Sequence, residues 1–385
     1  MKFYLKIFLI IFFITYNNSY SVAKSSFGLT PADTSAHQNK NSSSNTLHSN
    51  QTLKLKYSLN TAGNKITLAG LHSSSNNYNP LKTRTVKTPL SYKVKELPEK
   101  NTILKYQLAD GTYWRTQTDL KYARFLSIMG GIAMIDLFAF NQLRHIWDQE
   151  NMTKMHSMNW WNDVHNYQRM DKIGHFTDAY FVSDLTSKLY RWSGISGTES
   201  VWYGALTGWL WMLQIEISDG FFADWGFSWL DLSANTLGSG FFVLQHYFPE
   251  VLGGLHPKIS YHVSSKWKNN LYEKTPKAFI DDYEGITFWM AINPYHYFPD
   301  SWKRGFPKWL APLGIAVGYG AEGIAENPQF GRPQWYVGLD IDLRKIPIGN
   351  ESGFFKFIKS ELNFIRLPLP TIRFTPSGIW YGFYF

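Results

Sequence analysis

The sequence contains no cysteine among its 385 residues. Disulfide bonds, thiolate metal sites and thiol catalysis are therefore excluded within this chain. For the same reason we expect no lipid anchor on an acylated N-terminal cysteine. Any attachment to a membrane should then depend on other residues.

Long uncharged apolar stretches are also scarce. A helix that crosses a bilayer needs about 20 predominantly apolar residues, and the best candidate, residues 201–213, is soon followed by Glu216 and Asp219. We therefore favour helices that are buried in a protein core or lie at a membrane surface, with shallow insertion as the alternative. The chain is rich in aromatic residues, with 16 Trp, 23 Tyr and 28 Phe, which suits either a packed core or a membrane–water interface.

Excess positive charge is absent from the part of the chain that we expect to fold. The formal net charge is +9, but residues 24–100 contain 11 Lys and Arg against 3 Asp and Glu. Residues 101–385 contain 25 basic and 26 acidic residues. Nucleic-acid binding requires a basic face on a folded module, so we expect no nucleic-acid partner.

The N-terminus has the parts of a secretory signal peptide. Two lysines precede an apolar run over residues 7–14, and small residues at 21–23 offer a cleavage site. The segment that follows is rich in Ser, Asn, Thr and Lys, and its few apolar residues cannot offset the entropy cost of ordering it. We predict a signal peptide over residues 1–23 and a disordered linker over residues 24–100.

Four apolar segments with helix-ending signals and short connections follow the linker. They cover residues 120–147, 171–192, 198–218 and 228–247. Thr198 is the expected N-cap of the third helix, with Glu199 in its first turn. We expect a helical domain over residues 101–255, in which neighbouring helices are antiparallel.

Polar residues interrupt three of these apolar helices. Asp171, His175 and Asp178 share one face of the second helix by i,i+4 and i,i+3 spacing. The other members of this polar set are Lys172 in the second helix, Glu216 and Asp219 in the third, and Ser228, Asp231 and Asn235 in the fourth. If the three faces meet, they form a cluster of carboxylates, His and Lys in a low-dielectric environment, which can support proton transfer or divalent metal binding.

This polar set has three interpretations. The one that we favour is a structural hydrogen-bond network that fixes helix packing, and Asp171 also lies where a helix cap would explain it. The second is a site for a ligand or a lipid headgroup. The third is catalysis, with His175 as base or metal ligand, Glu216 and Asp231 as acid/base or metal carboxylates, and Lys172 as an anion-binding cation. The candidate metal ligands are His175 and Glu216, and the sequence indicates no cofactor.

The same residues carry a family resemblance. The run D-K-I-G-H-F at residues 171–176, Gly204 and Gly208, Glu216, and the pattern S-x-x-D-x-x-x-N-x-x-G at residues 228–238 resemble a family of predicted periplasmic lipoproteins of unknown function. A similar pattern occurs in VanZ-like membrane proteins, which are linked to glycopeptide resistance and whose helices span the membrane. The resemblance covers roughly residues 115–250, and the downstream segments look like an extended form found in Bacteroidota envelope proteins. It implies an envelope location and a polar helical core but no reaction, and this chain departs from the lipoproteins in lacking Cys.

The C-terminal third has the pattern of strands. Residues 334–345 alternate, with Trp335, Val337 and Leu339 on one face, which is typical of a half-buried antiparallel strand. Further strands are predicted at residues 285–292, 314–324, 354–366, 370–375 and 378–385. The fold class is therefore α+β, a four-helix core followed by a β-rich domain over residues 256–385. Its antiparallel sheet either packs on the helices or forms part of a membrane-associated barrel.

These features favour an exported protein of the periplasm or outer membrane. We expect it to be non-catalytic and associated with the outer membrane on its periplasmic side or inserted in it, with membrane or envelope lipid as its partner. The alternative is an envelope hydrolase or transferase that acts on a lipid or glycan through the His/carboxylate cluster. The sequence indicates no particular protein partner.

Overall fold

The computed structural model describes residues 106–107, 113–114, 119–146, 152–269, 282–324, 329–346 and 353–385. The predicted signal peptide and linker lie outside the described residues. The described residues all belong to one structural unit, which includes Val94–Phe385. The boundary expected after residue 255 stays a prediction.

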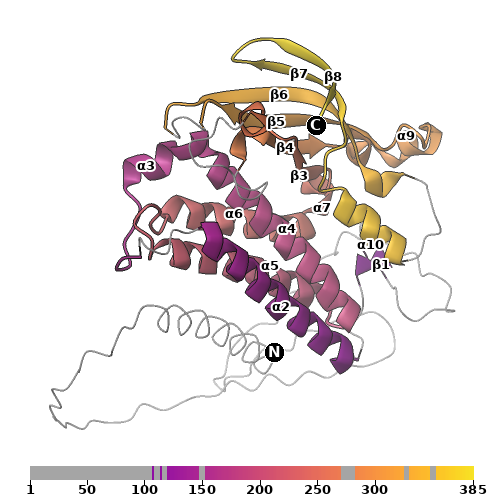
Figure 1. Ribbon diagram of the computed structural model, residues 1–385. Coiled ribbons are helices and arrows are strands. Elements are labelled where there is room, and N and C mark those ends of the chain that lie inside the picture. The colour runs from indigo at the N-terminus through magenta and orange to yellow at the C-terminus, as the bar shows by residue number, and fades with distance from the viewer. Residues whose placement is uncertain are drawn as a thin grey trace, which may run out of the picture. The chain divides into compact units, whose positions relative to one another are not determined.

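The four predicted helices are confirmed to within about two residues at each end. They are α2 (Tyr122–Ile146), α4 (Met170–Ser193), α5 (Gly197–Asp219) and α6 (Trp229–Tyr247). Helix α4 contacts each of the other three (Figure 1). The short helix α3 (Trp160–His165) precedes α4.

The expected N-cap of α5 is wrong. The cap is Ser196, whose hydroxyl accepts a hydrogen bond from the Glu199 backbone N–H at 3.2 Å and donates to the Glu199 carboxylate at 3.0 Å. The Ser-x-x-Glu spacing is that of a capping box, with the Glu199 carboxylate here accepting from the Ser196 hydroxyl. The helix therefore begins at Gly197, one residue before Thr198.

Two glycines let the backbones of α4, α5 and α6 approach closely. A Cβ atom on Gly204 of α5 would lie 2.5 Å from the carbonyl oxygen of Ser183 in α4. A Cβ atom on Gly238 of α6 would overlap the carbonyl of Phe176 in the same helix α4. Small residues at these two crossings therefore determine how close the polar faces of the three helices come.

Replacing Gly238 by Ala should lower the free energy of unfolding by about 1–3 kcal/mol, because α6 must move away from α4 to admit the methyl group. The matched control is Gly240→Ala in the same helix, where no atom lies within 4 Å of an added Cβ. That change should be neutral or stabilise by up to about 1 kcal/mol through helix propensity. Urea unfolding of both variants measures the difference, and equal stabilities would contradict the close-packing argument.

The C-terminal strands form one six-stranded antiparallel sheet in the order of the chain. The strands are β3 (Leu255–Tyr261), β4 (Ile286–Ile292), β5 (Leu313–Glu322), β6 (Arg332–Ile341), β7 (Leu369–Thr375) and β8 (Ile379–Tyr384). Strands β3 and β8 are its edges, so the alternative of a barrel is wrong for the described residues. A separate two-stranded sheet pairs β1 (Tyr106–Gln107) with β2 (Tyr113–Trp114).

Two predictions in this region need correction. Residues 354–366 were expected to form a strand, but most of them lie in helix α10 (Gly353–Leu362). Apolar residues at 354, 358 and 362 recur at the helical spacing of four, and this period decides against a strand. Strand β3 was not predicted, because Pro257 and Lys258 interrupt its apolar pattern.

The N-terminal end of α4 lies against the sheet. Helix α4 contacts β3, β4 and β5, and its Met170 is buried in a cluster with Ile286 and Phe288 of β4. This packing places the first turn of α4, which carries Asp171 and Lys172, between the sheet and the other helices.

The sheet has an apolar outer face, and its inner face carries buried polar side chains together with the aromatic cluster of Trp289, Tyr336 and Tyr384. The predicted alternation of β6 is confirmed, and the apolar residues are the exposed ones: Trp335, Val337 and Leu339 are 40%, 41% and 48% exposed, whereas Tyr336 and Asp340 are buried. On the inner face the ammonium of Lys258 lies 2.8 Å from the Asp340 carboxylate. The outer face is covered by Met170 of α4 at Ile286 and Phe288. Met290 lies two residues beyond Phe288 on the same face of β4, and from there the apolar face continues as an exposed surface over β5 and β6.

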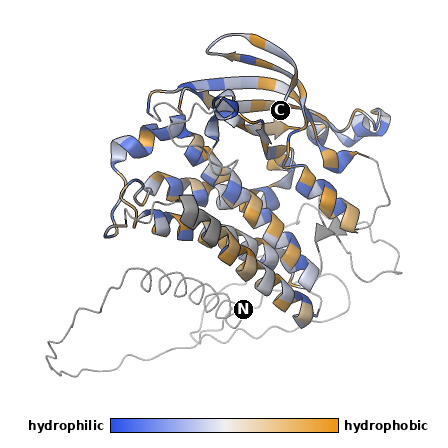
Figure 2. Cartoon of the chain, viewed as in Figure 1, coloured by the Kyte–Doolittle hydropathy of each residue, from blue (hydrophilic) through white to orange (hydrophobic). Residues whose placement is uncertain are grey.

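Helix α2 is a second exposed apolar element (Figure 2). Among the described residues it is the one helix that could cross a membrane by length and composition, over Tyr122–Ala139. Only 17% of this window is buried. It includes Arg124 and Asp136, and the Asp136 carboxylate accepts a hydrogen bond from Gln214 of α5. Residues 201–213, the best candidate for a membrane-spanning helix from the sequence, lie in α5. This helix does not meet the criteria of length and composition that α2 meets.

Candidate functional site

Seven of the nine predicted polar residues come together where α4, α5 and α6 meet. We call this group, with one further residue from α3, the polar cluster: Asp163, Asp171, Lys172, His175, Glu216, Ser228, Asp231 and Asn235. Asp178 is exposed and is not part of it. Asp219 ends α5, where its backbone carbonyl accepts hydrogen bonds from Phe222 and Gly226. Its charge adds to burial in raising the pKa of Glu216, so Asp219 adjoins the cluster.

Lys172 is the cation at the centre of the cluster. Its ammonium lies 2.9 Å from Asp163, 3.2 Å from Asp171 and 2.8 Å from Asp231, measured to the nearest carboxylate oxygen. Burial disfavours the charged ammonium, but Asp171 and Asp231 outweigh burial and raise the pKa of Lys172. One positive charge therefore connects three carboxylates from α3, α4 and α6.

His175 lies one turn further along α4 and is held from both ring nitrogens. Its Nδ1 is 3.1 Å from Asn235 Oδ1 and 3.2 Å from Glu216 Oε1, and its Nε2 is 3.6 Å from Asp171 Oδ1. Burial alone would lower the pKa of His175, but Asp171 and Asp231 raise it to about 9. The ring is therefore protonated at neutral pH when no other cation is present.

The carboxyl groups of the cluster differ in their affinity for protons. Burial raises the pKa of Glu216 to about 9, although His175 opposes this shift. Burial, followed by repulsion from Asp171, raises the pKa of Asp231 to about 6. The pKa of Asp171 is lowered, because His175 and Lys172 outweigh its burial. At neutral pH the cluster therefore contains ionised Asp171 and protonated Glu216 at opposite ring nitrogens of His175.

Asp163 is the member that the sequence did not predict. It is 2% exposed, and its carboxylate accepts a hydrogen bond from the Ser228 hydroxyl at 2.5 Å. Ser228 in turn caps α6 by accepting from the Asp231 N–H at 2.9 Å. The signal for Asp163 is weak, because α3 is only six residues long and lies outside the predicted helices.

A left-handed turn brings Asp163 over the start of α4. Tyr167, Gln168 and Arg169 have φ angles of 51°, 51° and 65°, which is uncommon for residues with a Cβ atom. The Tyr319 hydroxyl of β5 donates to the Gln168 carbonyl at 2.5 Å, so the sheet helps to hold this turn. Arg169 is the N-cap residue of α4, so Asp171 is not the cap. The Asp171 carboxylate instead forms an ion pair with Lys172.

The cluster offers one group of possible metal ligands. One carboxylate oxygen from each of Asp171 and Asp231 and one ring nitrogen of His175 lie within 4.8 Å of one another. Glu216, the other predicted ligand, contacts the opposite ring nitrogen of His175 instead. The side chains of His175 and Asp171 are 12% and 19% exposed, so the group is not sealed from solvent.

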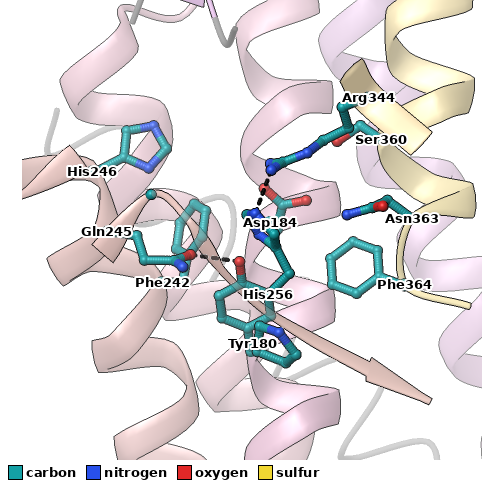
Figure 3. Close-up of a pocket in the computed structure, with 12 residues that line it drawn as sticks. Tyr180, Asp184, Phe242, Gln245, His246, His256, Arg344, Ser360, Asn363 and Phe364 are labelled. Atoms are coloured by element: carbon teal, nitrogen blue, oxygen red, sulfur yellow. Dashed lines mark hydrogen bonds between the residues drawn. The ribbon is translucent and has the colours of Figure 1, made fainter. Parts of the chain in front are cut away.

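A separate polar pocket lies between α4, α6, β3 and α10 (Figure 3). Its cavity has a volume of about 40 Å³. Arg344 donates to His256 Nε2 at 2.5 Å, and burial, followed by this Arg344 charge, holds the pKa of His256 well below its usual value. Tyr180 donates to Gln245 at 2.5 Å. A cavity of this size has room for one or two water molecules.

Comparison with known proteins agrees with this description of the helical region. The fold and the cluster define an α+β protein with a buried polar core in its helices. Residues 158–247 match the family model described as "Predicted periplasmic lipoprotein (DUF2279)", and this range contains every residue of the polar cluster. No curated protein and no solved structure matches the chain. The family description agrees with the export predicted from the N-terminus. The protein is therefore an exported protein of the cell envelope. The VanZ-like resemblance stays a prediction.

Replacing Lys172 by Met should lower the free energy of unfolding by about 3–5 kcal/mol, because three carboxylates lose their shared cation. Lys154→Met, at an exposed position, is the control and should change stability by less than about 0.5 kcal/mol. Thermal and urea unfolding near pH 7 measure both variants. If the two lysine variants were equally stable, Lys172 would not be the centre of the network.

Proposed function

We propose that the protein is a non-catalytic component of the cell envelope that contacts the outer membrane through the outer face of its sheet. The observation that carries this proposal is the apolar character of that face. In water-soluble antiparallel sheets the apolar side chains normally face the core and the polar ones face solvent. Here α4 covers only the part of the apolar face near Ile286 and Phe288, and the apolar side chains of β5 and β6 beyond it stay exposed, as they do in sheets that face lipid.

The apolar residues form continuous rows across the strands. One row joins Met290, Val317, Val337, Ile372 and Trp380, which pair in register from β4 to β8. A second row joins Ile292, Ile315 and Leu339. Paired residues on neighbouring strands point to the same face, so these side chains make one patch. Patches of this kind on a protein surface mark interaction sites.

The surroundings of the patch favour lipid as the occupant. The segment that joins β4 to β5 exposes Trp302 and Trp309, and it also carries Lys303, Arg304 and Lys308. Tryptophan is enriched at the level of lipid headgroups, and basic side chains are attracted to anionic lipid. A hydrocarbon-facing patch with an aromatic and basic border is therefore complementary to a membrane surface.

We expect Val317→Glu combined with Val337→Glu to reduce binding to vesicles of phosphatidylethanolamine and phosphatidylglycerol at least tenfold. The reason is that each buried valine contributes about 1.5 kcal/mol and a carboxylate in hydrocarbon is strongly disfavoured. Vesicle flotation of the purified protein measures the loss, and density-gradient separation of membranes from expressing cells reports which membrane it joins.

The matched control is Val251→Glu on α7 (Pro249–Leu252), since Val251 is 65% exposed but lies outside the patch. The proposal is supported if this control still binds and co-sediments with the outer membrane. It is overturned if the double variant floats like the wild type. It is also overturned if Phe138→Glu, on the exposed side of α2, is the change that abolishes binding.

A second candidate function is hydrolysis or group transfer on an envelope lipid or glycan. One observation favours it: His175 and two carboxylates lie together at a site that solvent still reaches. His175 would then be the base or a ligand, with Asp231 and Glu216 in acid/base roles.

The variants His175→Gln and Glu216→Gln distinguish the two functions. For a non-catalytic protein we expect any loss of function in a complemented deletion strain to follow the loss of stability and of protein level. A catalytic protein would instead lose function while the variants stay folded, exported and abundant. Immunoblotting of envelope fractions and thermal unfolding of the purified variants provide the comparison.

A further inference from the structure

We propose that the polar cluster binds one divalent transition-metal ion, such as Zn²⁺, through Asp171, His175 and Asp231. The ion would connect α4 to α6 at the end of the helices that lies against the sheet. This inference goes beyond the membrane contact proposed above and does not depend on it.

The positions of the three side chains fit a metal site. Asp171 and His175 are four residues apart and therefore on one face of α4, and Asp231 lies in the first turn of α6. His175 Nε2 and Asp171 Oδ1 are 3.6 Å apart. Two ligands at about 2.0–2.1 Å from a tetrahedral zinc ion are about 3.3 Å apart. The pair is thus close to ligand spacing, and Asp231 supplies an oxygen within 4.8 Å of both.

An orphaned carboxylate oxygen points to a ligand independently of this spacing. Asp231 is 3% exposed, and its Oδ2 contacts Lys172 at 2.8 Å. Its Oδ1 is buried and has no hydrogen-bond partner among the described residues. A buried carboxylate oxygen without a partner is costly. A metal ion at Oδ1 would supply the missing contact.

The neighbouring groups hold the three ligands as metal sites usually require. Lys172 contacts the Oδ2 atoms of both Asp171 and Asp231, which leaves Asp231 Oδ1 for a metal. Asp171 Oδ1 accepts a hydrogen bond from the Tyr283 hydroxyl at 3.2 Å and would bind the metal through its second lone pair. Glu216 and Asn235 meet His175 at Nδ1, which leaves the Nε2 lone pair of a neutral imidazole for the same metal. Outer groups that orient ligands in this way are typical of metal centres, and here they are positioning residues.

The balance of charged groups also favours a cation. The cluster contains four carboxyl groups but only Lys172 and His175 as bases; the carboxyl groups are those of Asp163, Asp171, Glu216 and Asp231. With Glu216 protonated and His175 a neutral ligand, three aspartates still face the one ammonium of Lys172, and a divalent ion offsets this excess. An imidazole ligand suits Zn²⁺ and its neighbours in the transition series, whereas Mg²⁺ and Ca²⁺ prefer sites made of oxygen atoms alone.

The test uses the full mature chain after treatment with a chelator. Titration calorimetry with Zn²⁺ should give one ion per chain, and Mg²⁺ should not compete. Saturation with Zn²⁺ should raise the unfolding temperature by about 5 °C or more. Asp231→Asn should weaken Zn²⁺ binding at least about 100-fold, and Glu216→Gln should weaken it about 10–100-fold.

The control is Asp184→Asn in α4, which removes a partly buried carboxylate that pairs with Lys188 outside the polar cluster. It should bind Zn²⁺ as the wild type does. Co²⁺ added to the wild type provides a measurement that needs no variant, because its visible absorption reports coordination by nitrogen and oxygen. The proposal is overturned if the wild type binds no stoichiometric Zn²⁺, in which case the cluster is held by hydrogen bonds and ion pairs alone. It is also overturned if Asp231→Asn binds Zn²⁺ as tightly as Asp184→Asn does.

Discussion

The helical part of the protein depends on the ion pairs of Lys172. Three carboxylates from α3, α4 and α6 can be buried together only because one ammonium contacts all of them. The same contact sets how α6 lies along α4. From Lys172 and Asp231 the polar contacts continue one turn on to His175 and Asn235, so the two helices run in the same direction. A shift by one helical turn would separate every pair at once, which makes the cluster a strong determinant of register.

The sequence predicts the helical half of this arrangement better than the rest. Apolar period and caps locate α2, α4, α5 and α6, and the i,i+4 spacing of Asp171 and His175 places both on one face. Asp163 could not be found in this way, because it reaches the cluster through a left-handed turn of three residues with Cβ atoms. Such a turn is stabilised by tertiary contacts, here from Tyr319, and not by local propensity. Contacts of this kind have no periodic signature.

The sheet illustrates a different limit. Alternation with a period of two predicts that β6 has an apolar and a polar face, but the period does not say which face meets the protein. The answer comes from partners far away in sequence: Lys258 on β3 lies opposite Asp340, and the guanidinium of Arg366 lies 3.9 Å from the Trp289 ring centroid. The polar groups on this face therefore find their partners within the protein. The aliphatic face is covered by α4 only near Ile286 and Phe288, and its exposure over β5 and β6 could be recognised only from the assembled sheet.

The absence of cysteine gives the apolar face its significance in the proposed function. The matching family is described as lipoproteins, whereas this chain has no cysteine to acylate. A single acyl chain gives only marginal, reversible membrane binding. Eight aliphatic or aromatic side chains in the two rows, each contributing a fraction of about 1.5–3 kcal/mol on burial in hydrocarbon, can exceed the contribution of one such chain, as the several chains of a lipoprotein anchor also do. A surface of this kind also fixes the orientation of the protein on the membrane, which an acyl chain at the end of a long linker does not.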